Sequence, residues 1–286
     1  MTCPGELIAI DDTSLWVVIR GEGYPILILH GGPGIDHHTF GDYLDPLTEG
    51  GFQLVLVDQR SQGRSEPAPV HTWSLERMSQ DVIMLARALG FRRYAVLGHS
   101  FGAFVTLQNA VDFPGMASQS IVSSGLPSMR YLEHVWANLD SFEPEHLCEQ
   151  VRSSWERELT AVTQEDVASI MSDQAPFHFA DPLDPRILEY ERRTAGAIYP
   201  PDVGRHFAAS DYGGIDLEAR LEEVRSPTLV LAGRHDRTCV VEASEAIAKG
   251  IPMADLVVFE NSAHMTFVEE QELYLSAVRS FLERYV

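Results

Sequence analysis

Short runs of apolar residues recur along the chain, separated by segments whose apolar positions follow a helical spacing. The runs lie at Ile26–Leu29, Gln53–Val57, Tyr94–Leu97, Ser120–Ser123, Thr228–Ala232 and Leu256–Phe259. Continuous apolar strands are typical of a parallel sheet that is covered by helices on both faces. Residues 6–10 and 14–20 alternate more strongly, which predicts an antiparallel hairpin at the leading edge of the sheet. The pattern therefore predicts an α/β protein with a mostly parallel, doubly wound sheet.

The sequence predicts one helix clearly, between the strands expected at Gln53–Val57 and Tyr94–Leu97. Residues 74–89 carry apolar side chains at helical spacing, and Gly90 follows as a stop signal. The apolar positions are Leu75, Met78, Val82, Leu85 and Leu89. We expect this helix to pack on the sheet.

The regular alternation of strands and helices is interrupted once. It stops after Gly125 and resumes at Ser226, and amphipathic helices are predicted in between at 145–159 and 164–171. Proline-rich turns are expected at Pro176, Pro182, Pro185, Pro200 and Pro201. We therefore predict a core formed by residues 1–125 and 226–286, with residues 126–225 inserted as a helical cap.

The charge of the chain restricts its partners. A formal net charge of -21 and a pI near 4.8 argue against binding to nucleic acid or to an anionic membrane, because phosphate groups would be repelled. No stretch approaches the roughly 18 apolar residues that a membrane span needs. We expect a monomer or small homo-oligomer that acts on a small-molecule acyl substrate or a short peptide.

The cysteines and the first residues favour a cytoplasmic protein. Cys3, Cys148 and Cys239 lie far apart, without the spacing of a disulfide framework or a zinc site. The first residues lack the basic start and apolar core of a signal peptide. The adjacent histidines His37 and His38 also lack the spacing of metal ligands, so we expect neither a metal ion nor a cofactor.

The strongest chemical signal is the sequence Gly98-His-Ser100-Phe-Gly102. It follows a predicted strand and precedes an apolar helix, which is the setting in which a serine is held on a strained turn with its hydroxyl exposed. The alternative is a structural glycine turn that contains a serine by chance. We predict that Ser100 is a nucleophile.

A serine hydroxyl needs a base, and the base needs a group that orients it. Asp236 follows the strand 228–232, and His264 follows the strand 256–259, so both lie beyond the carboxyl ends of predicted strands. The alternatives are a helix N-cap for Asp236 and a structural loop residue for His264. His235 is a competing imidazole, but its side chain should point away from that of Asp236. We predict Ser100, Asp236 and His264 as a catalytic triad.

A glycine-rich loop supplies candidates for the oxyanion hole. His30-Gly31-Gly32-Pro33-Gly34 follows the strand 26–29, and residues without side chains let backbone amides approach a ligand. We expect the N–H groups of Gly32 and Phe101 to form the hole, with His30, Gly31, Pro33 and Gly34 supporting the loop. A purely structural glycine turn is the alternative.

These motifs resemble the α/β-hydrolase superfamily and, within it, the proline iminopeptidase-like branch. The resemblance covers about 8–125 and 226–286, and it rests on the motif 30–34, the run Asp58-Gln-Arg60 ending in Gly63-Arg-Ser65, and the serine motif. It implies a helical cap and the hydrolysis of an acyl bond without a cofactor.

Three residues depart from the iminopeptidase pattern. His99 and Phe101 stand where iminopeptidases usually have glycine and tryptophan, and Ser61 stands where they have glycine. These departures look more like general esterases, lactonases and carbon–carbon bond hydrolases. The sequence therefore predicts a serine hydrolase that cleaves an ester, lactone or amide through an acyl-enzyme.

Two alternatives stay open. A proline iminopeptidase would need a carboxylate of the cap to bind the amino end of its substrate, and the cap offers Glu143, Glu145, Glu149, Glu156, Glu158, Glu189 and Glu191. A non-catalytic ligand receptor with the same fold is the more distant alternative, since it would have no use for a complete triad.

Overall fold

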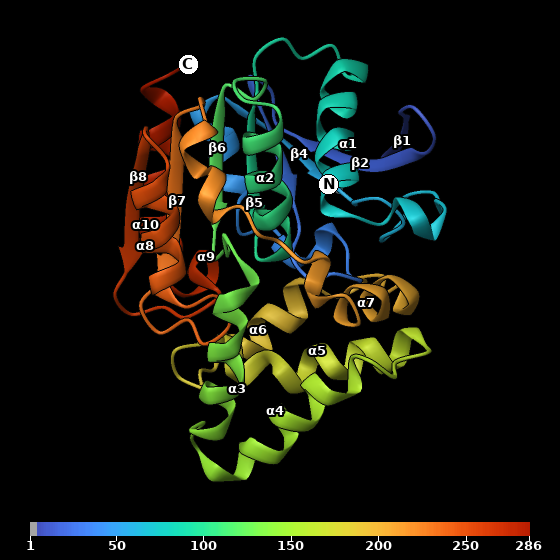
Figure 1. Cartoon of the computed structure of the whole chain (residues 1–286), viewed down its shortest axis with the longest axis vertical. Helices are drawn as coiled ribbons and strands as arrows, with labels where there is room; N and C mark the ends of the chain where they lie inside the picture. The colour runs from blue at the N-terminus through green and yellow to red at the C-terminus, as the bar shows by residue number, and fades with distance from the viewer. Residues whose placement is uncertain (1–4) are drawn as a thin grey trace.

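The computed structural model describes residues 5–286, and its centre is an eight-stranded sheet (Figure 1). The strand order is β1-β2-β4-β3-β5-β6-β7-β8. The strands are β1 (Glu6–Ala9), β2 (Ser14–Arg20), β3 (Tyr24–Leu29), β4 (Phe52–Val57), β5 (Ala95–His99), β6 (Gln119–Ser123), β7 (Thr228–Gly233) and β8 (Ala254–Phe259). Only β1 and β2 are antiparallel to their neighbours, so the predicted hairpin and mostly parallel sheet are confirmed.

The helices of the chain fall into two groups by their position in the sequence. Those of the sheet layers are α1 (Leu75–Ala88), α2 (Phe101–Asp112), α8 (Val241–Gly250), α9 (Thr266–Glu269) and α10 (Gln271–Glu283). Those between β6 and β7 are α3 (Glu133–Asp140), α4 (Glu145–Arg157), α5 (Gln164–His178), α6 (Arg186–Arg193) and α7 (Pro201–Ala208).

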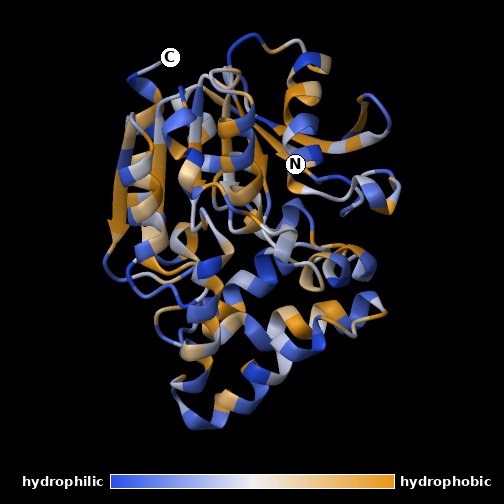
Figure 2. Ribbon diagram, in the orientation of Figure 1, coloured by the Kyte–Doolittle hydropathy of each residue, from blue (hydrophilic) through white to orange (hydrophobic). Residues whose placement is uncertain are grey.

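Both faces of the sheet are buried, which explains why its strands are apolar throughout. Side chains from α1, α2 and α8 pack on one face, where Val55, Val96 and Val230 point. Side chains from α10 pack on the other face with Ile28 and Leu97. Figure 2 shows the resulting concentration of apolar residues in the strands.

The sequence of α1 explains its bounds. The Ser74 side chain caps the helix by accepting a hydrogen bond from the Arg77 N–H, and Gly90 beyond the last turn has a φ of 75°. Leu75, Met78, Val82 and Leu85 are all buried in one core cluster. The predicted helix is confirmed.

Helices α3 to α7, which we call the cap helices, gather at one end of the sheet (Figure 1). The chain enters and leaves this region through a short antiparallel contact, in which Ser128 pairs with Asp216. The Met129 N–H donates to the Ile215 carbonyl oxygen, and the Leu217 N–H donates to the Pro127 carbonyl oxygen. We call this contact the neck.

One expected turn is wrong. Pro176 lies inside α5, which continues to His178 instead of ending near residue 171. A proline within a helix loses one hydrogen bond, but Pro176 sits in the last turn, and Ala175, Pro176 and Phe177 are all buried there. Burial of these apolar side chains outweighs the missing bond. Pro185 and Pro201 instead lie at the starts of α6 and α7, where proline is well tolerated.

Cys148 and Cys239 are free thiols, whereas Cys3 lies outside the described residues. Within residues 5–286, no helix combines the length and the apolar character that a membrane crossing requires.

Candidate functional site

Ser100 lies at a sharp corner between β5 and α2. Its φ of 56° is in the left-handed region, which non-glycine residues rarely adopt. The flanking glycines make the corner possible: a Cβ added to Gly98 would lie 2.0 Å from the Gly102 carbonyl oxygen, and one added to Gly102 would lie 2.2 Å from the Leu29 carbonyl oxygen. Gly98 is thus required by the closeness of β5 to α2, and Gly102 by the closeness of α2 to the end of β3.

Asp236 and His264 are brought together from the loops that follow β7 and β8. Nδ1 of His264 donates to Oδ2 of Asp236 at 2.8 Å, and both side chains are buried. The other carboxylate oxygen accepts the N–H groups of Thr238 and Cys239, each at 2.8 Å. This arrangement fixes the imidazole and leaves its Nε2 as the proton acceptor.

Two of the alternative interpretations of this region, an N-cap role for Asp236 and His235 as the imidazole, do not match the geometry. Helix α8 begins at Val241 with Val240 as its N-cap, so Asp236 does not cap it. His235 is exposed, while the Asp236 side chain is turned inward to His264.

Ser100 and His264 share one cavity with the glycine loop. The cavity has a volume of about 240 Å³, and its wall also includes Gly31, Gly32 and Pro33. The opposite wall comes from α4, α5, α6 and α7, which contribute residues such as Trp155, Met171, Tyr190 and Arg205. Ser100, His264 and part of the glycine loop therefore lie where the end of the sheet meets the cap helices.

The glycine loop approaches the serine closely. A Cβ added to Gly31 would lie 3.0 Å from Cβ of Ser100, and Gly32 has a φ of 102°. Phe101 is the first residue of α2, so its N–H has no acceptor within the helix. The Phe101 N–H is thus free of the helix ladder beside Ser100, and the glycine loop brings further backbone close to the same serine.

The ring of His30 fixes the conformation of this loop through hydrogen bonds. Its Nδ1 donates to the Gly31 carbonyl oxygen at 2.8 Å, and its Nε2 accepts the Gln59 N–H at 3.1 Å. Burial lowers the pKa of His30, which keeps the ring neutral in this tautomer. The Gly34 N–H is fixed in turn by Oε1 of Gln62 at 2.7 Å. His30 contacts the loop and not the cavity.

Two further histidines, neither of which is marked as a site residue by a motif in the sequence, flank His264. The ring centroids of His99 and His178 lie 4.9 and 5.1 Å from that of His264. Burial, reinforced by the positive charge that His264 can carry, holds the pKa of both flanking rings well below the ordinary value. Both flanking rings are therefore held in their neutral form. No sequence signal places His178 here, because it reaches the site from α5.

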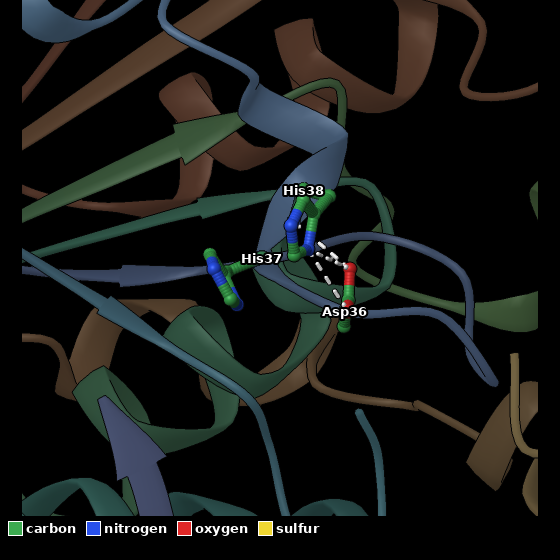
Figure 3. A group of neighbouring side chains, drawn as sticks. All are labelled: Asp36, His37 and His38. Carbon is green, nitrogen blue, oxygen red and sulfur yellow. Dashed lines mark hydrogen bonds and ion pairs between the residues drawn. The ribbon is translucent and has the colours of Figure 1, made fainter. Parts of the chain in front are cut away.

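A group with the donor types of a metal site lies behind the glycine loop. Ligand atoms of Asp36, His37 and His38 lie within 4.8 Å of one another. Figure 3 shows His38 bonded to Asp36, whereas the His37 ring, whose centroid lies 4.4 Å from that of His38, is bonded to neither residue.

Several polar atoms of this group already make hydrogen bonds or ion pairs. Nη1 of Arg64 is 2.9 Å from the Asp36 carboxylate, which also accepts the Ile198 N–H, and Nδ1 of His37 donates to Asp58 at 2.5 Å. A cation would have to displace the guanidinium, so this cluster fits a structural link better than a metal site.

Comparison with known proteins then establishes the family. A sequence model of the α/β-hydrolase fold matches residues 24–271. The chain belongs to this family. A proline iminopeptidase from Clostridium botulinum is 26% identical over 276 residues, which cover 92% of this chain and 91% of that protein.

Solved structures share the fold of this α/β hydrolase. An esterase from Exiguobacterium antarcticum superposes with a TM-score of 0.77 at 21% identity, covering 98% of this chain and 100% of that one. A proline iminopeptidase from Mycobacterium smegmatis gives a TM-score of 0.76 at 21% identity, covering 99% and 98%.

The structure explains one departure of this α/β hydrolase from the iminopeptidase pattern. Ser61 has a φ of 60°, a conformation that favours glycine. Its hydroxyl accepts the Ala68 N–H at 2.8 Å and Nε1 of Trp73 at 2.9 Å. These two hydrogen bonds offset the strain, so a serine can replace the glycine there.

The cap wall of the cavity contains two of the seven candidate glutamates, Glu158 and Glu191. Glu158 accepts hydrogen bonds from Nε2 of Gln174 at 2.6 Å and from the Tyr212 hydroxyl. Burial raises the pKa of Glu158 above its ordinary value. The cavity therefore has two carboxyl groups in a wall that is otherwise largely apolar, and that of Glu158 is the one held by these two hydrogen bonds.

Proposed function

We propose that this α/β hydrolase is a serine hydrolase that cleaves an ester, lactone or amide bond of a small substrate. The observation that carries the proposal is the 2.8 Å bond between His264 and Asp236 beside a serine that is held on a strained corner in the same cavity. Strand ends of one sheet supply all three groups.

In the proposed reaction, Oγ of Ser100 attacks the acyl carbon while Nε2 of His264 takes the hydroxyl proton. The carbonyl oxygen becomes negative and is stabilised by the N–H groups of Gly32 and Phe101. The carbon–heteroatom bond then breaks, and His264 returns its proton to the leaving group. A water molecule, deprotonated by His264, hydrolyses the acyl-enzyme and restores the Ser100 hydroxyl.

We propose in addition that residues 126–225 act as a cap that selects the substrate. A cavity of about 240 Å³ suits a small ligand, and the cap wall brings apolar side chains such as Ile170 and Met171. Glu158 adds a hydrogen-bonding group to the same wall. These features favour a partly apolar acyl group.

Covalent labelling tests the nucleophile. A fluorophosphonate probe should modify the chain at Ser100, and Ser100→Ala should abolish labelling and lower kcat for a para-nitrophenyl ester at least about a thousandfold. Ser124→Ala is the matched control and should still be labelled. Ser124 also has a positive φ, but its hydroxyl donates to the His264 carbonyl oxygen and is not the proposed nucleophile. Labelling that persists in Ser100→Ala would exclude the proposed nucleophile.

A second candidate, proline iminopeptidase activity, is favoured by the Glu158 carboxyl group in the cavity wall and by the C. botulinum relative. A buried ammonium group needs a carboxylate partner. Proline para-nitroanilide should then be cleaved at least roughly tenfold faster than its N-acetylated form, since one charge pair contributes on the order of 1.4 kcal/mol or more.

A matched pair of variants completes this test. Glu158→Gln should abolish the preference for the free amine, whereas Glu156→Gln should keep it, because Glu156 is exposed in the last turn of α4, the helix whose C-cap is Glu158, and does not line the cavity. Equal rates on the two anilides, or activity on esters and lactones alone, would reject the iminopeptidase and leave the general serine hydrolase.

A further inference from the structure

The end of α5 forms a strap between the cap helices and the site. We call residues 177–180 the strap. The His178 carbonyl oxygen accepts the N–H groups of His264 and Met265 at 3.0 and 3.3 Å. The strap therefore touches the backbone of the candidate catalytic histidine directly.

The loop that follows β7 holds the strap from a second side. The Arg237 guanidinium donates to the Phe179 carbonyl oxygen at 2.7 Å and to the Ala180 carbonyl oxygen at 3.1 Å. Arg237 follows Asp236 in the chain, so the loops of both triad partners of Ser100 are bonded to the strap.

A buried carboxylate completes the connection. Oε1 of Glu269 accepts the Ala180 N–H, and Oε2 accepts the Ala263 N–H, each at 2.8 Å. Ala180 belongs to the strap, and Ala263 immediately precedes His264. The two oxygens of one side chain thus join the end of the cap helices to the loop that carries the imidazole.

We propose that Glu269 is a positioning residue that couples the cap to the catalytic histidine through this pair of hydrogen bonds. The inference rests on the proposed serine hydrolase function for its kinetic readout. Glu269 does not line the cavity, so it acts through His264 and the strap and does not contact the substrate.

The coupling depends on the charge of Glu269. A carboxylate can accept both N–H groups, whereas a protonated carboxyl group presents an O–H to one of the two donors and loses that bond. Burial raises the pKa of Glu269 to about 7, although the two backbone N–H groups act in the opposite direction. The coupling should therefore weaken as the pH falls below neutrality.

Charged groups on neighbouring elements surround Glu269. Arg186 donates to the Glu269 carbonyl oxygen and favours the carboxylate, and Asp184 opposes it. Arg237 lies close enough to interact electrostatically. The next residue, Glu270, accepts hydrogen bonds from the Asn261 N–H and the Ser262 hydroxyl, and it makes no hydrogen bond to the strap.

The decisive experiment compares Glu269→Gln with the wild-type chain from pH 5.5 to 8.5. An amide keeps one acceptor oxygen at every pH, so kcat/KM of the variant should be roughly tenfold lower at pH 8.5. The ratio of wild type to variant should fall towards one at pH 5.5, where wild-type Glu269 is protonated. A ratio that does not change with pH would overturn the proposal.

Glu270→Gln is the matched control. Its carboxylate fixes the same loop without bonding the strap, so the ratio of wild type to this variant should not vary with pH. The same pH-dependent ratio in Glu270→Gln would contradict a role that is specific to Glu269.

A readout without turnover separates this inference from the proposed function. The unfolding midpoint is measured for Ser100→Ala alone and for Ser100→Ala combined with Glu269→Gln. A pKa raised from 4.5 to about 7 on folding means that the chain with Glu269 loses stability relative to the double variant as the pH rises from about 5 to about 7. If the difference in unfolding midpoint between these two chains is constant from pH 5 to 8.5, the proposal is overturned, even if no substrate is turned over.

Discussion

Asp236 fixes the tautomer of His264 through one oxygen and is itself fixed through the other. In Asp236→Asn, the side-chain oxygen should keep the N–H groups of Thr238 and Cys239, which directs the amide NH₂ at Nδ1 of His264. The imidazole proton then moves to Nε2, and the ring can no longer accept the serine proton. The fold should survive, because the shape of the side chain is unchanged.

We expect kcat of Asp236→Asn to fall by roughly 10³ to 10⁴, as measured on a para-nitrophenyl ester. The exposed Asp255→Asn, which removes only the carboxylate of an ion pair with Arg284, is the control and should retain full activity. Activity of Asp236→Asn within tenfold of wild type would contradict the assigned role of Asp236.

Individual residues could be predicted from sequence where a strand end and a polar residue coincide. Asp236 and His264 both follow apolar strands, so their placement at one edge of the sheet followed from parallel pairing. His178 and Glu269 were not found, because their contacts with the His264 loop run between the cap helices and the core. Such contacts leave no local pattern in the chain.

At the scale of single elements, the corner between β5 and α2 depends on Gly98. Gly98→Ala would place a methyl group 2.0 Å from the Gly102 carbonyl oxygen, so the strand and the helix would have to separate. We expect a loss of about 3 kcal/mol or more in the free energy of unfolding, measured by urea denaturation.

Gly204→Ala is the contrasting substitution. A Cβ added there would meet its nearest atom, the Pro33 carbonyl oxygen, at 3.5 Å, and Gly204 lies within α7. This variant should be neutral or gain about 0.5–1 kcal/mol from helix propensity. Similar losses for the two alanine variants would show that the corner is not the cause.

The elements of the sheet followed from the sequence more closely than those of the cap. Strands buried on both faces leave unbroken apolar runs, whereas α5 combines buried and exposed positions with a proline in its last turn. Its length is decided by the burial of Phe177, which depends on tertiary contacts with Phe142 and Trp155. A prediction from local propensity therefore ends α5 too early.

At the scale of the whole molecule, Arg237 ties the cap helices to the core. Arg237→Ala would leave the carbonyl oxygens of Phe179 and Ala180 without this donor, at a cost of about 1–3 kcal/mol. We expect faster limited proteolysis with cleavage among residues 133–208, together with a higher KM.

Arg234→Ala is the control for this prediction. Arg234 is exposed on the same loop and pairs only with Glu260 among the described residues, an arrangement that contributes little to stability. Its proteolysis should match that of the wild-type chain. Equal rates of proteolysis in Arg237→Ala and Arg234→Ala would show that the Arg237 guanidinium does not restrain the cap helices.

The neck at Ser128 and Asp216 also has a consequence for the evolution of such a protein. The segment between these residues departs from the sheet and returns to it at a single two-stranded stem, next to the paired strands β6 and β7. Insertions or deletions beyond the stem leave the register of those strands untouched. One contiguous stretch of a gene therefore encodes all the cap helices, and under the proposed function its exchange by recombination would change the specificity of the same sheet in a single event.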